Sequence, residues 1–221
     1  MTPTTETWRS LLAAAMRIVA SVKDGYGPLD IRMGGGTVLM FRFGHRVSKD
    51  IDLFIHDAQA LAYLSPRLND AAAQGILDYQ EQANAIKFVL TLGDIDFIVA
   101  GSVTRASPPD GLDVEGVRIP LDATAEILGK KLLYRAESFK ARDVFDMAVA
   151  LALDRPAAME AIRATAPTRP ALRRRLPALE REATGPLPGT LLPTALGAPY
   201  VHGMFEALYE ALREADRAGV P

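Results

Sequence analysis

The spacing of apolar residues changes along the first third of the chain, and each spacing predicts a different element. Trp8, Leu11 and Leu12, followed by further apolar residues at helical intervals, predict an N-terminal helix. A short apolar run interrupted by an acid predicts a strand at Ile51–Ile55. The elements expected in this region are a helix over Thr7–Val22, a strand over Asp30–Met33, a helix over Thr37–Phe43 closed by Gly44, a strand over Ile51–Ile55 and a helix over Ala58–Ala72.

The middle of the chain has the pattern of strands, and the remainder has that of helices. Ile86–Thr91 and Ile95–Ala100 flank Leu92-Gly93-Asp94, which predicts a hairpin. We further expect a short strand over Val114–Ile119, helices over about Ala123–Ala136 and Ala141–Leu153, a helix restarting at Pro156, a span rich in Pro and Gly from Pro167 to Pro199, and a helix over about Val201–Arg217. This order favours an α+β fold, with α/β as the alternative. A small mixed sheet would lie in a core of residues 1–121, and residues 122–221 would form a C-terminal helical lobe.

Composition narrows the class of protein. Of the 221 residues, 49% are apolar and 24% are charged, so the chain can bury a core. The formal net charge of -2 gives no overall basic field, so any nucleic-acid binding would be local. With no cysteine, disulfides, thiolate nucleophiles and Cys-based zinc sites are excluded. The N-terminus lacks a signal-peptide pattern and no apolar run reaches membrane-spanning length, so we expect a cytoplasmic protein with no membrane partner.

The most informative chemistry is a set of acids inside apolar strands. Asp50 and Asp52 are two residues apart and would project from one face of a strand. Two adjacent carboxylates repel each other unless a cation compensates, and hard divalent cations such as Mg²⁺ prefer oxygen ligands. Asp96 lies in a second apolar strand, with Ile95 and Phe97 on the opposite face. If the strands are adjacent, Asp50, Asp52 and Asp96 converge as metal ligands for nucleotidyl transfer. Asp94, at the turn, is the rival for the third position.

The residues around the first two acids suit a phosphate. Gly35 and Gly36 allow close approach of a backbone, and a helix beginning near Thr37 would direct N–H groups at the ligand. Ser48 could donate a hydroxyl hydrogen bond, and Arg46 could act as a cationic clamp. Each signal is common on its own, but their order favours a nucleotide-binding site.

These residues resemble the AbiEii/AbiGii-type nucleotidyltransferase toxins of the polymerase-β-like superfamily, which include mycobacterial toxins of the MenT type. The resemblance covers about Arg32 to Leu151. It rests on Gly35-Gly36-Thr37, on His45-Arg46-x-Ser48-x-Asp50-Ile51-Asp52-Leu53-Phe54, and on the blocks Glu126–Leu132 and Arg142–Met147. It implies a polymerase-β-like fold that carries the acids on a small mixed sheet flanked by helices.

The resemblance also implies site residues. Asp50 and Asp52 match the metal-binding pair, Lys131 matches a lysine near the nucleotide, and Asp146 matches a downstream catalytic acid. Lys130 is adjacent to Lys131, and Asp143 is the alternative to Asp146. A break near Ser138, a candidate N-cap, would let a second helix fold back and bring Asp146 towards Lys131. Arg142, on the same helical stripe, is expected to bind nucleotide.

The implied reaction moves a nucleoside monophosphate from an NTP to an acceptor, with Mg²⁺ or Mn²⁺. The expected acceptor is RNA, at the 3′ end of a transfer RNA, and the expected partner is an antitoxin. The alternatives are an aminoglycoside-like small molecule or a protein hydroxyl as acceptor, or a nucleotide-binding module without catalysis. A basic stretch around Arg173-Arg174-Arg175 could hold RNA, although a solvated helix face is the more common explanation. The three histidines lack zinc-ligand spacing.

Overall fold

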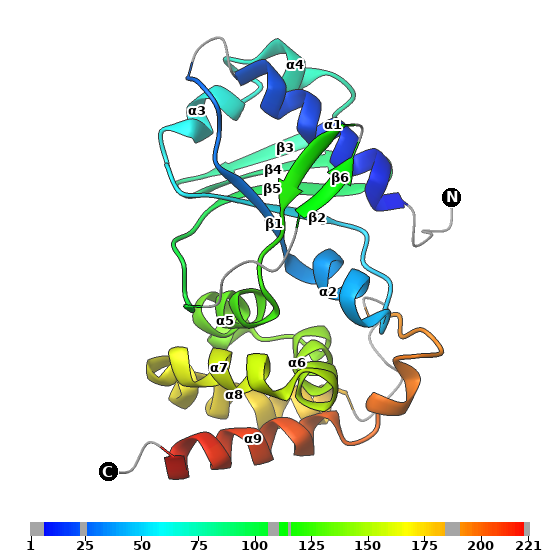
Figure 1. Cartoon of the computed structure of the whole chain (residues 1–221), viewed down its shortest axis with the longest axis vertical. Helices are drawn as coiled ribbons and strands as arrows, with labels where there is room; N and C mark the ends of the chain where they lie inside the picture. The colour runs from blue at the N-terminus through cyan, green and yellow to red at the C-terminus, as the bar shows by residue number, and fades with distance from the viewer. Residues whose placement is uncertain (1–6, 23–25, 106–110, 115, 184–190, 219–221) are drawn as a thin grey trace. The chain divides into compact units, whose positions relative to one another are not determined.

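The computed structural model of the protein describes residues 7–22, 26–105, 111–114, 116–183 and 191–218. The chain divides into two compact units, drawn in Figure 1. The sheet unit consists of Met1–Val38, Ser48–Gly101 and Pro108–Asp122, and the helical unit of Leu39–Val47, Ser102–Ser107 and Ala123–Pro221. Helix α2 (Gly35–Phe43) begins in the first unit and ends in the second. The helical unit therefore takes two segments from the N-terminal half of the chain.

A five-stranded mixed sheet is the framework of the sheet unit. Its order is β1-β2-β5-β4-β3, in which β2 and β5 run parallel and the other three pairs are antiparallel. The strands are β1 (Ile31–Gly34), β2 (Ile51–Ile55), β3 (Asp78–Gln82), β4 (Ala85–Leu90) and β5 (Gly93–Val99). The predicted β4–β5 hairpin and the β2 strand are confirmed, and the chain is of the mixed α+β class.

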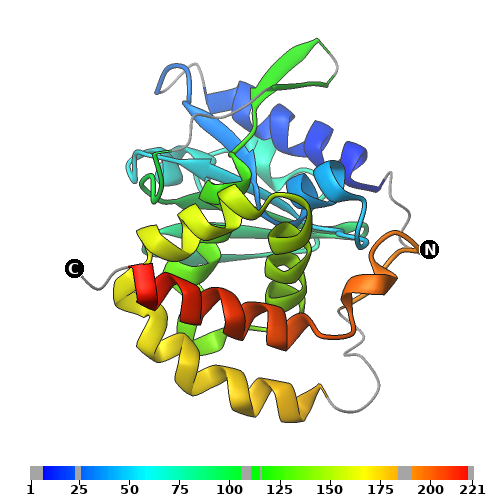
Figure 2. The ribbon, with the colours of Figure 1, turned by 60° about the horizontal axis from the view of Figure 1, so that its bottom comes forward.

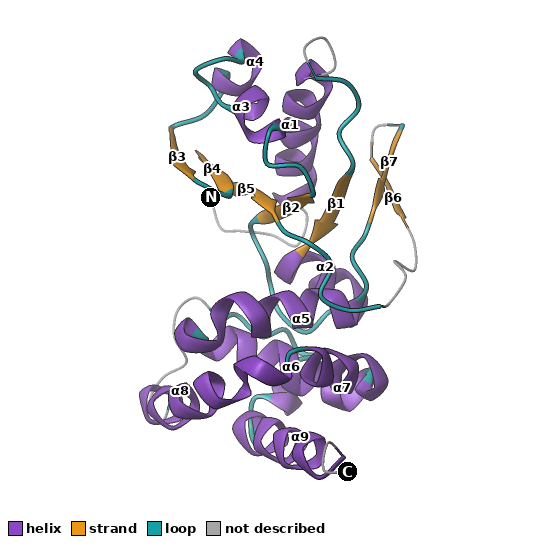
Figure 3. Ribbon diagram, turned by 90° about the vertical axis from the view of Figure 1, so that its left-hand side faces the viewer, coloured by secondary structure: helices purple, strands orange, loops and turns teal. Residues whose placement is uncertain are grey.

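One face of this sheet is the core of the unit. Side chains alternate between the two faces of a strand, so Leu53 on β2 and Phe97 on β5 share the face opposite the acids. Both are fully buried, as are Leu11 and Leu12 of the helix above them. That helix, α1 (Thr7–Val22), covers the same face as α3 (Ala60–Leu64) and α4 (Asp70–Ala73), as Figures 1 and 3 show. The apolar face is thereby closed, and the polar face is left for chemistry.

Two predicted elements of the sheet unit are wrong. In place of one helix over Ala58–Ala72, the chain forms α3 and α4. Pro66 disfavours helical geometry at the residue before it, and the Asn69 side chain then accepts hydrogen bonds from the backbone of Ala71 and Ala72, which starts α4.

The strand expected over Val114–Ile119 is instead a separate two-stranded ribbon, made of β6 (Gly111–Val114) and β7 (Val117–Pro120). Gly116 lies in the turn between them with a φ of +81°, a value that glycine adopts without strain.

The helical unit is a stack of helices around an apolar interior. Its helices are α5 (Thr124–Arg135), α6 (Ala141–Leu153), α7 (Arg155–Ala164), α8 (Arg169–Glu182) and α9 (Met204–Ala218), with single 3₁₀ turns at Ala136–Ser138, Ala166–Thr168 and Ala198–Tyr200. Figure 2 shows α9 running beside α6 and α8. Leu128, Val144 and Leu208, from three of these helices, are fully buried. No helix in the described part of the chain has the length and apolar character needed to cross a membrane.

The break between α5 and α6 falls where the sequence predicts it. The 3₁₀ turn ends at Ser138, and α6 starts three residues later. Ser138 is not the N-cap, however. That position is Lys140, whose backbone N–H donates to Asp143 Oδ2 at 3.1 Å. The expected C-cap of α2 is also present, because Gly44 has a φ of +60° and donates to the Met40 carbonyl.

Candidate active site

A row of polar residues crosses the sheet on the face opposite its core. In the register of the strands, Asp52 on β2 lies directly beside Asp96 on β5, and Asp96 lies directly beside Lys87 on β4. Asp50 and Asp94 come two residues before Asp52 and Asp96, so they project from the same face. We call these four aspartates and Lys87 the acidic row. The two strands that the sequence left unplaced are therefore parallel neighbours.

The register and contacts distinguish the two rivals for the third acid. Asp96 pairs with Asp52 across the parallel strands. Asp94 points its Oδ2 at the ammonium of Lys87, at 2.8 Å, and its backbone N–H donates to Asp50 Oδ1 at 3.2 Å. Asp96 is therefore the better candidate for the third acid, because it lies beside Asp52. Asp94 instead contacts Lys87 and Asp50.

The acidic row carries more negative charge than its surroundings neutralise. Lys87 Nζ, 3.2 Å from Asp96 Oδ2, is the one cationic group in ion-pair contact with these four acids in the part of the chain that the structure describes. Burial, and next the charge of Asp52, raise the pKa of Asp96 to about 6 in spite of Lys87. For Lys87 burial lowers the pKa, but Asp94 and Asp96 outweigh it, so the net shift is upward. The row therefore favours binding of a further cation.

The donor chemistry of the row fits a divalent cation. Carboxylate oxygens are the ligands that Mg²⁺ and Mn²⁺ prefer, and Asp52 and Asp96 lie side by side on one face. In the described residues, no three acidic or histidine side chains are grouped closely enough to hold one ion. Asp50 lies at the end of the pair, with one oxygen bound to the Asp94 N–H. The geometry thus presents a pair of ligands with a third acid nearby.

Gly35 packs closely against the carboxylate of Asp52. It has a φ of +67°, and a Cβ at this position would collide with the carboxylate of Asp52. Any other residue would both strain the backbone and displace that carboxylate. The absence of a Cβ at Gly35 therefore leaves room for the Asp52 carboxylate, and Gly35 is also the first residue of α2.

The next residues connect the helix start to the strand. Thr37 is fully buried, and its Oγ1 donates to the backbone carbonyl of Asp50 at 2.5 Å. Gly36 lies between Gly35 and Thr37 in the first turn of α2, which begins two residues earlier than predicted. Ser48 is half-buried and lies two residues before Asp50. The Gly-Gly-Thr segment thus holds the backbone that carries Asp50.

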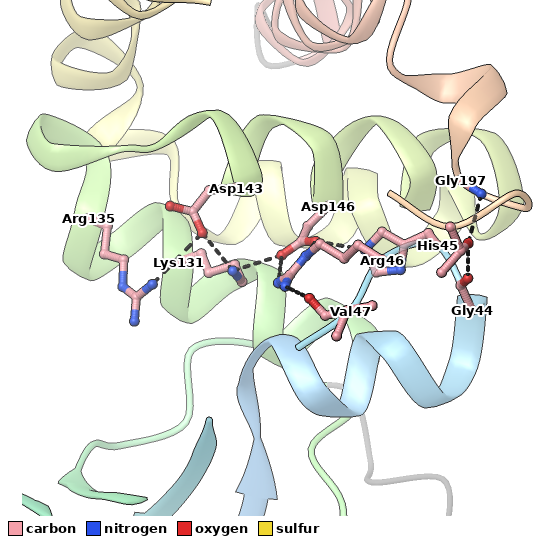
Figure 4. A network of polar contacts seen from close by, with 10 residues as sticks. Gly44, His45, Arg46, Val47, Lys131, Arg135, Asp143, Asp146 and Gly197 are labelled. Carbon is pink, nitrogen blue, oxygen red and sulfur yellow. Dashed lines mark hydrogen bonds and ion pairs between the residues drawn. The ribbon is translucent and has the colours of Figure 1, made fainter. Parts of the chain in front are cut away.

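A second polar cluster lies wholly inside the helical unit (Figure 4). Its centre is Asp146, which is fully buried on α6. Asp146 Oδ1 is 2.7 Å from His45 Nε2 and 2.6 Å from Arg46 Nε, and its Oδ2 is 2.9 Å from both Arg46 Nη2 and Lys131 Nζ. Lys131 Nζ also donates to Asp143 at 2.6 Å. We call His45, Arg46, Lys131, Asp143 and Asp146 the buried cluster.

The charges of the buried cluster balance. Burial raises the pKa of Asp146, but Arg46 and Lys131 outweigh it and hold the pKa well below its usual range. Burial likewise raises the pKa of Asp143, and Lys131 followed by Arg135 reverses the shift. Both acids are therefore ionised at neutral pH, opposite two buried cations. Because an ionised carboxylate can only accept, His45 must carry its proton on Nε2. Its Nδ1 has no hydrogen-bond partner in the described structure.

The neighbouring residues Lys130 and Lys131, in the block Glu126–Leu132, have different partners. Lys130 pairs with Glu126 on the same helix at 3.4 Å, whereas Lys131 meets both acids of α6. Glu126 in turn accepts hydrogen bonds from the backbone of Val103 and Thr104. Arg142 is half-buried and has no hydrogen bond or ion pair to another described residue. The expected approach of Asp146 to Lys131 is thus observed.

Sequence reasoning missed Lys87 and the contact of His45 with Asp146. Lys87 lies between Ile86 and Phe88, which are buried on the core face, so strand alternation was the signal that could have placed Lys87 on the polar face. The contact between His45 and Asp146 spans 101 residues and has no sequence signal.

The basic stretch on α8 is largely paired with acids. Arg169 and Arg173 both contact Asp216 on α9, and Arg175 contacts Glu182 at the end of its own helix. These contacts agree with a solvated, ion-paired helix face.

The mixed sheet, with two acids side by side on parallel strands and a Gly-Gly-Thr helix start against them, is the arrangement expected of a nucleotidyltransferase. Comparison with known families agrees. The model of the family described as "Nucleotidyl transferase AbiEii toxin, Type IV TA system" matches residues 23–214, and the chain belongs to this family. It is therefore an enzyme of the nucleotidyltransferase class, of the toxin–antitoxin type.

Solved structures with a similar chain path are distant in sequence. MenT4, a nucleotidyltransferase toxin from Mycobacterium tuberculosis H37Rv, is 17% identical over 94% of this chain and 87% of its own, with a TM-score of 0.47. A protein of H. pylori solved as a nucleotidyltransferase is 14% identical over 96% and 97%, with a TM-score of 0.45. ANT(2")-Ia in complex with adenylyl-2"-tobramycin is 16% identical over 75% and 98%, with a TM-score of 0.46. No curated protein matches the sequence, and the family assignment rests on the family model.

Proposed function

We propose that the protein is a divalent-cation-dependent enzyme that transfers a nucleoside monophosphate from an NTP to an RNA acceptor in the cytoplasm, as the toxin partner of an antitoxin. The observation that carries the chemistry is the Asp52–Asp96 pair, whose shared face and unbalanced charge suit a cation. The family supports the toxin role. The choice of RNA, at the 3′ end of a transfer RNA, is inferred from the family resemblance alone.

In this proposal Asp52 and Asp96 are the paired metal ligands, and Asp50 is the third, which would move closer to the pair when the cation binds. The start of α2 at Gly35, Gly36 and Thr37 faces the phosphates. Bound Mg²⁺ or Mn²⁺ would supply charge stabilisation for the triphosphate and pyrophosphate. The acceptor hydroxyl oxygen forms a bond to the α-phosphorus while the bond to the β-phosphate oxygen breaks. Pyrophosphate leaves, and the hydroxyl proton passes to a carboxylate of the row.

The remaining residues have supporting roles in the proposal. Ser48, Arg46, Lys131 and Arg142 bind the nucleotide. Asp146 acts as a positioning residue, because its two oxygens hold Arg46 and Lys131 at 2.6–2.9 Å. The catalytic effect of Asp146 would then be exerted through these two cations.

The proposal is tested by incubating the full-length protein with Mg²⁺, each of the four α-³²P-labelled NTPs and total RNA, with parallel reactions on an aminoglycoside mixture and on cell protein. We expect one nucleotide to label an RNA band of transfer-RNA size. Asp52→Ala should abolish labelling. Asp78→Asn, which removes an exposed carboxylate from β3 of the same sheet, should not. Labelling of only the small molecules or only protein would show that the acceptor is not RNA. Labelling that persists in Asp52→Ala would refute the proposed metal site.

A further inference from the structure

Lys87 is the cationic member of the acidic row, and its side chain contacts two of the four aspartates. It lies on β4, directly opposite Asp96 in the antiparallel register, so its side chain lies on the same face as the acids. Its ammonium bridges two carboxylates, 2.8 Å from Asp94 Oδ2 and 3.2 Å from Asp96 Oδ2. The neighbouring positions Ile86 and Phe88 are buried in the core, which fixes the strand and leaves Lys87 no other face.

The Lys87 ammonium lies closer to Asp94 than to Asp96, and this difference affects how a divalent cation could bind. Asp94 is the closer partner of Lys87, and its own backbone N–H is bound to Asp50. Asp96 is the farther partner and also lies beside Asp52. A divalent cation drawn to Asp52 and Asp96 would therefore meet the Lys87 ammonium on the Asp96 carboxylate, while Asp94 can keep hold of the ammonium after Asp96 is released.

We propose that Lys87 is a tethered counter-cation that neutralises Asp96 when no metal is bound and competes with the divalent cation for it, with Asp94 as the site to which the ammonium withdraws. This inference rests on the proposed function, because it needs the cation to bind at Asp52 and Asp96. It assigns separate roles to the two rival acids. Asp96 is the shared carboxylate, and Asp94 is a positioning residue that acts through Lys87.

The direction of the effect follows from charge alone. Removing the ammonium takes a positive charge away from the carboxylates that attract the metal. Lys87 and Asp94 are about one-third exposed, and water and salt screen such pairs strongly. We therefore expect a modest gain in metal affinity, roughly threefold to tenfold, larger at low salt than at high salt. In the metal-free protein the same change leaves Asp94 and Asp96 without their partner, so stability should fall.

The test is binding of Mn²⁺ to the full-length metal-free protein, followed by calorimetry and by electron paramagnetic resonance. Lys87→Met, which keeps the chain length and removes the charge, should bind Mn²⁺ more tightly than wild type by the factor above. Lys87→Arg should stay within about twofold of wild type. Lys49→Met is the matched control, because it removes an exposed lysine next to Asp50 that has no ion pair with a described residue.

A double-mutant cycle tests the part played by Asp94. Asp94→Asn alone should weaken Mn²⁺ binding. The Lys87 ammonium would then have Asp96 as its one charged partner among the described residues and would compete more strongly with Mn²⁺ for that carboxylate. In the Lys87→Met background the same change should have a clearly smaller effect. If Lys87→Met fails to fold, Lys87→Gln replaces it in the cycle.

The outcomes separate this inference from the proposed function. Equal or weaker Mn²⁺ binding by Lys87→Met, with binding lost in Asp52→Asn, would overturn the role of Lys87 and leave the metal site intact. Mn²⁺ binding that persists unchanged in both Asp52→Asn and Asp96→Asn would overturn the metal site itself. A loss of stability in Lys87→Met with unchanged Mn²⁺ affinity would reduce Lys87 to a structural ion pair and would also contradict the proposal.

Discussion

The acidic row and the buried cluster are both groups of carboxylates with cations, but their charges are arranged in opposite ways. In the row, four half-buried aspartates share a sheet face with one lysine. In the buried cluster, Asp143 and Asp146 face Arg46 and Lys131 and are fully buried. An excess of negative charge beside solvent favours the binding of a cation, whereas a buried network with balanced charges holds its own side chains in place. In the proposed function, the row therefore carries the chemistry and the cluster holds its residues in position.

The largest effect on stability is expected from Asp146→Asn in the buried cluster. The change removes the charge that balances Arg46 and Lys131, and breaking a buried pair in this way costs about 3–5 kcal/mol. Urea denaturation of the full chain measures it. Asp216→Asn is the matched control, because Asp216 also bridges two arginines but is half exposed, and its loss should be far smaller. Equal losses in the two variants would show that burial does not set the difference.

A smaller loss is expected from Gly35→Ala in the sheet unit. The φ of +67° disfavours a side chain, and the added methyl group must displace the Asp52 carboxylate. The combined penalty is about 2–3 kcal/mol, with a fall in transfer activity. Gly75→Ala provides the comparison, because Gly75 has a φ of +76° but open space around a Cβ. The backbone penalty is shared, so only Gly35→Ala should lose activity. If both variants retain full activity, the contact with Asp52 has no catalytic consequence.

Asp96→Asn should have the opposite sign and stabilise the metal-free protein. The raised pKa of about 6 means that the folded structure disfavours the ionised carboxylate at neutral pH. Replacing it by an isosteric amide should raise the free energy of unfolding by roughly 1–3 kcal/mol at pH 8 in EDTA. Thermal melting gives the measurement. A clear destabilisation would mean that the ion pair with Lys87 outweighs both the burial of Asp96 and its repulsion from Asp52.

The smallest effect is the pH dependence of the buried cluster. The pKa of Asp146 is depressed, so its contribution to stability is complete above its unfolded pKa, near 3.8, and is lost as the pH falls towards its folded pKa. The stability gap between wild type and Asp146→Asn should therefore be constant from pH 8 to about 5. It should shrink by about 1.4 kcal/mol for each pH unit below 3.8. A gap that narrows already between pH 7 and 5 would contradict an ionised Asp146 at the centre of the cluster.

Strand periodicity and turn residues were sufficient to predict the local part of the fold. They place Asp50 and Asp52 on one face, predict the β4–β5 hairpin, and locate the helix break near Ser138. The turn of the hairpin is at Thr91-Leu92, so Gly93 and Asp94, which were expected in the turn, belong to β5. The edge strand β3 was missed because Tyr79 is the one apolar residue of Asp78–Gln82, too few for an alternating pattern. Pro66 and Asn69 divide the helix that was expected as one.

Adjacency between distant segments could not be predicted in the same way. That β2 and β5 are parallel neighbours is a property of the whole sheet, and the 43 residues between Asp52 and Asp96 (53–95) contain no signal for it. The buried cluster likewise joins His45 and Arg46 to Asp146 across about one hundred residues. The resemblance to the family named most of the residues, but only the packed structure shows that Asp146 binds two cations and Lys131 two acids.

The most direct test of the assignment compares catalysis in Asp52→Asn with its stability. Pyrophosphate release should be measured with the NTP and acceptor found for wild type, next to the free energy of unfolding of both proteins. We expect Asp52→Asn to lose activity by roughly a thousandfold or more, with a stability equal to or above that of wild type. Activity within tenfold of wild type, or a loss that merely follows unfolding, would contradict the acidic row as the site of nucleotidyl transfer.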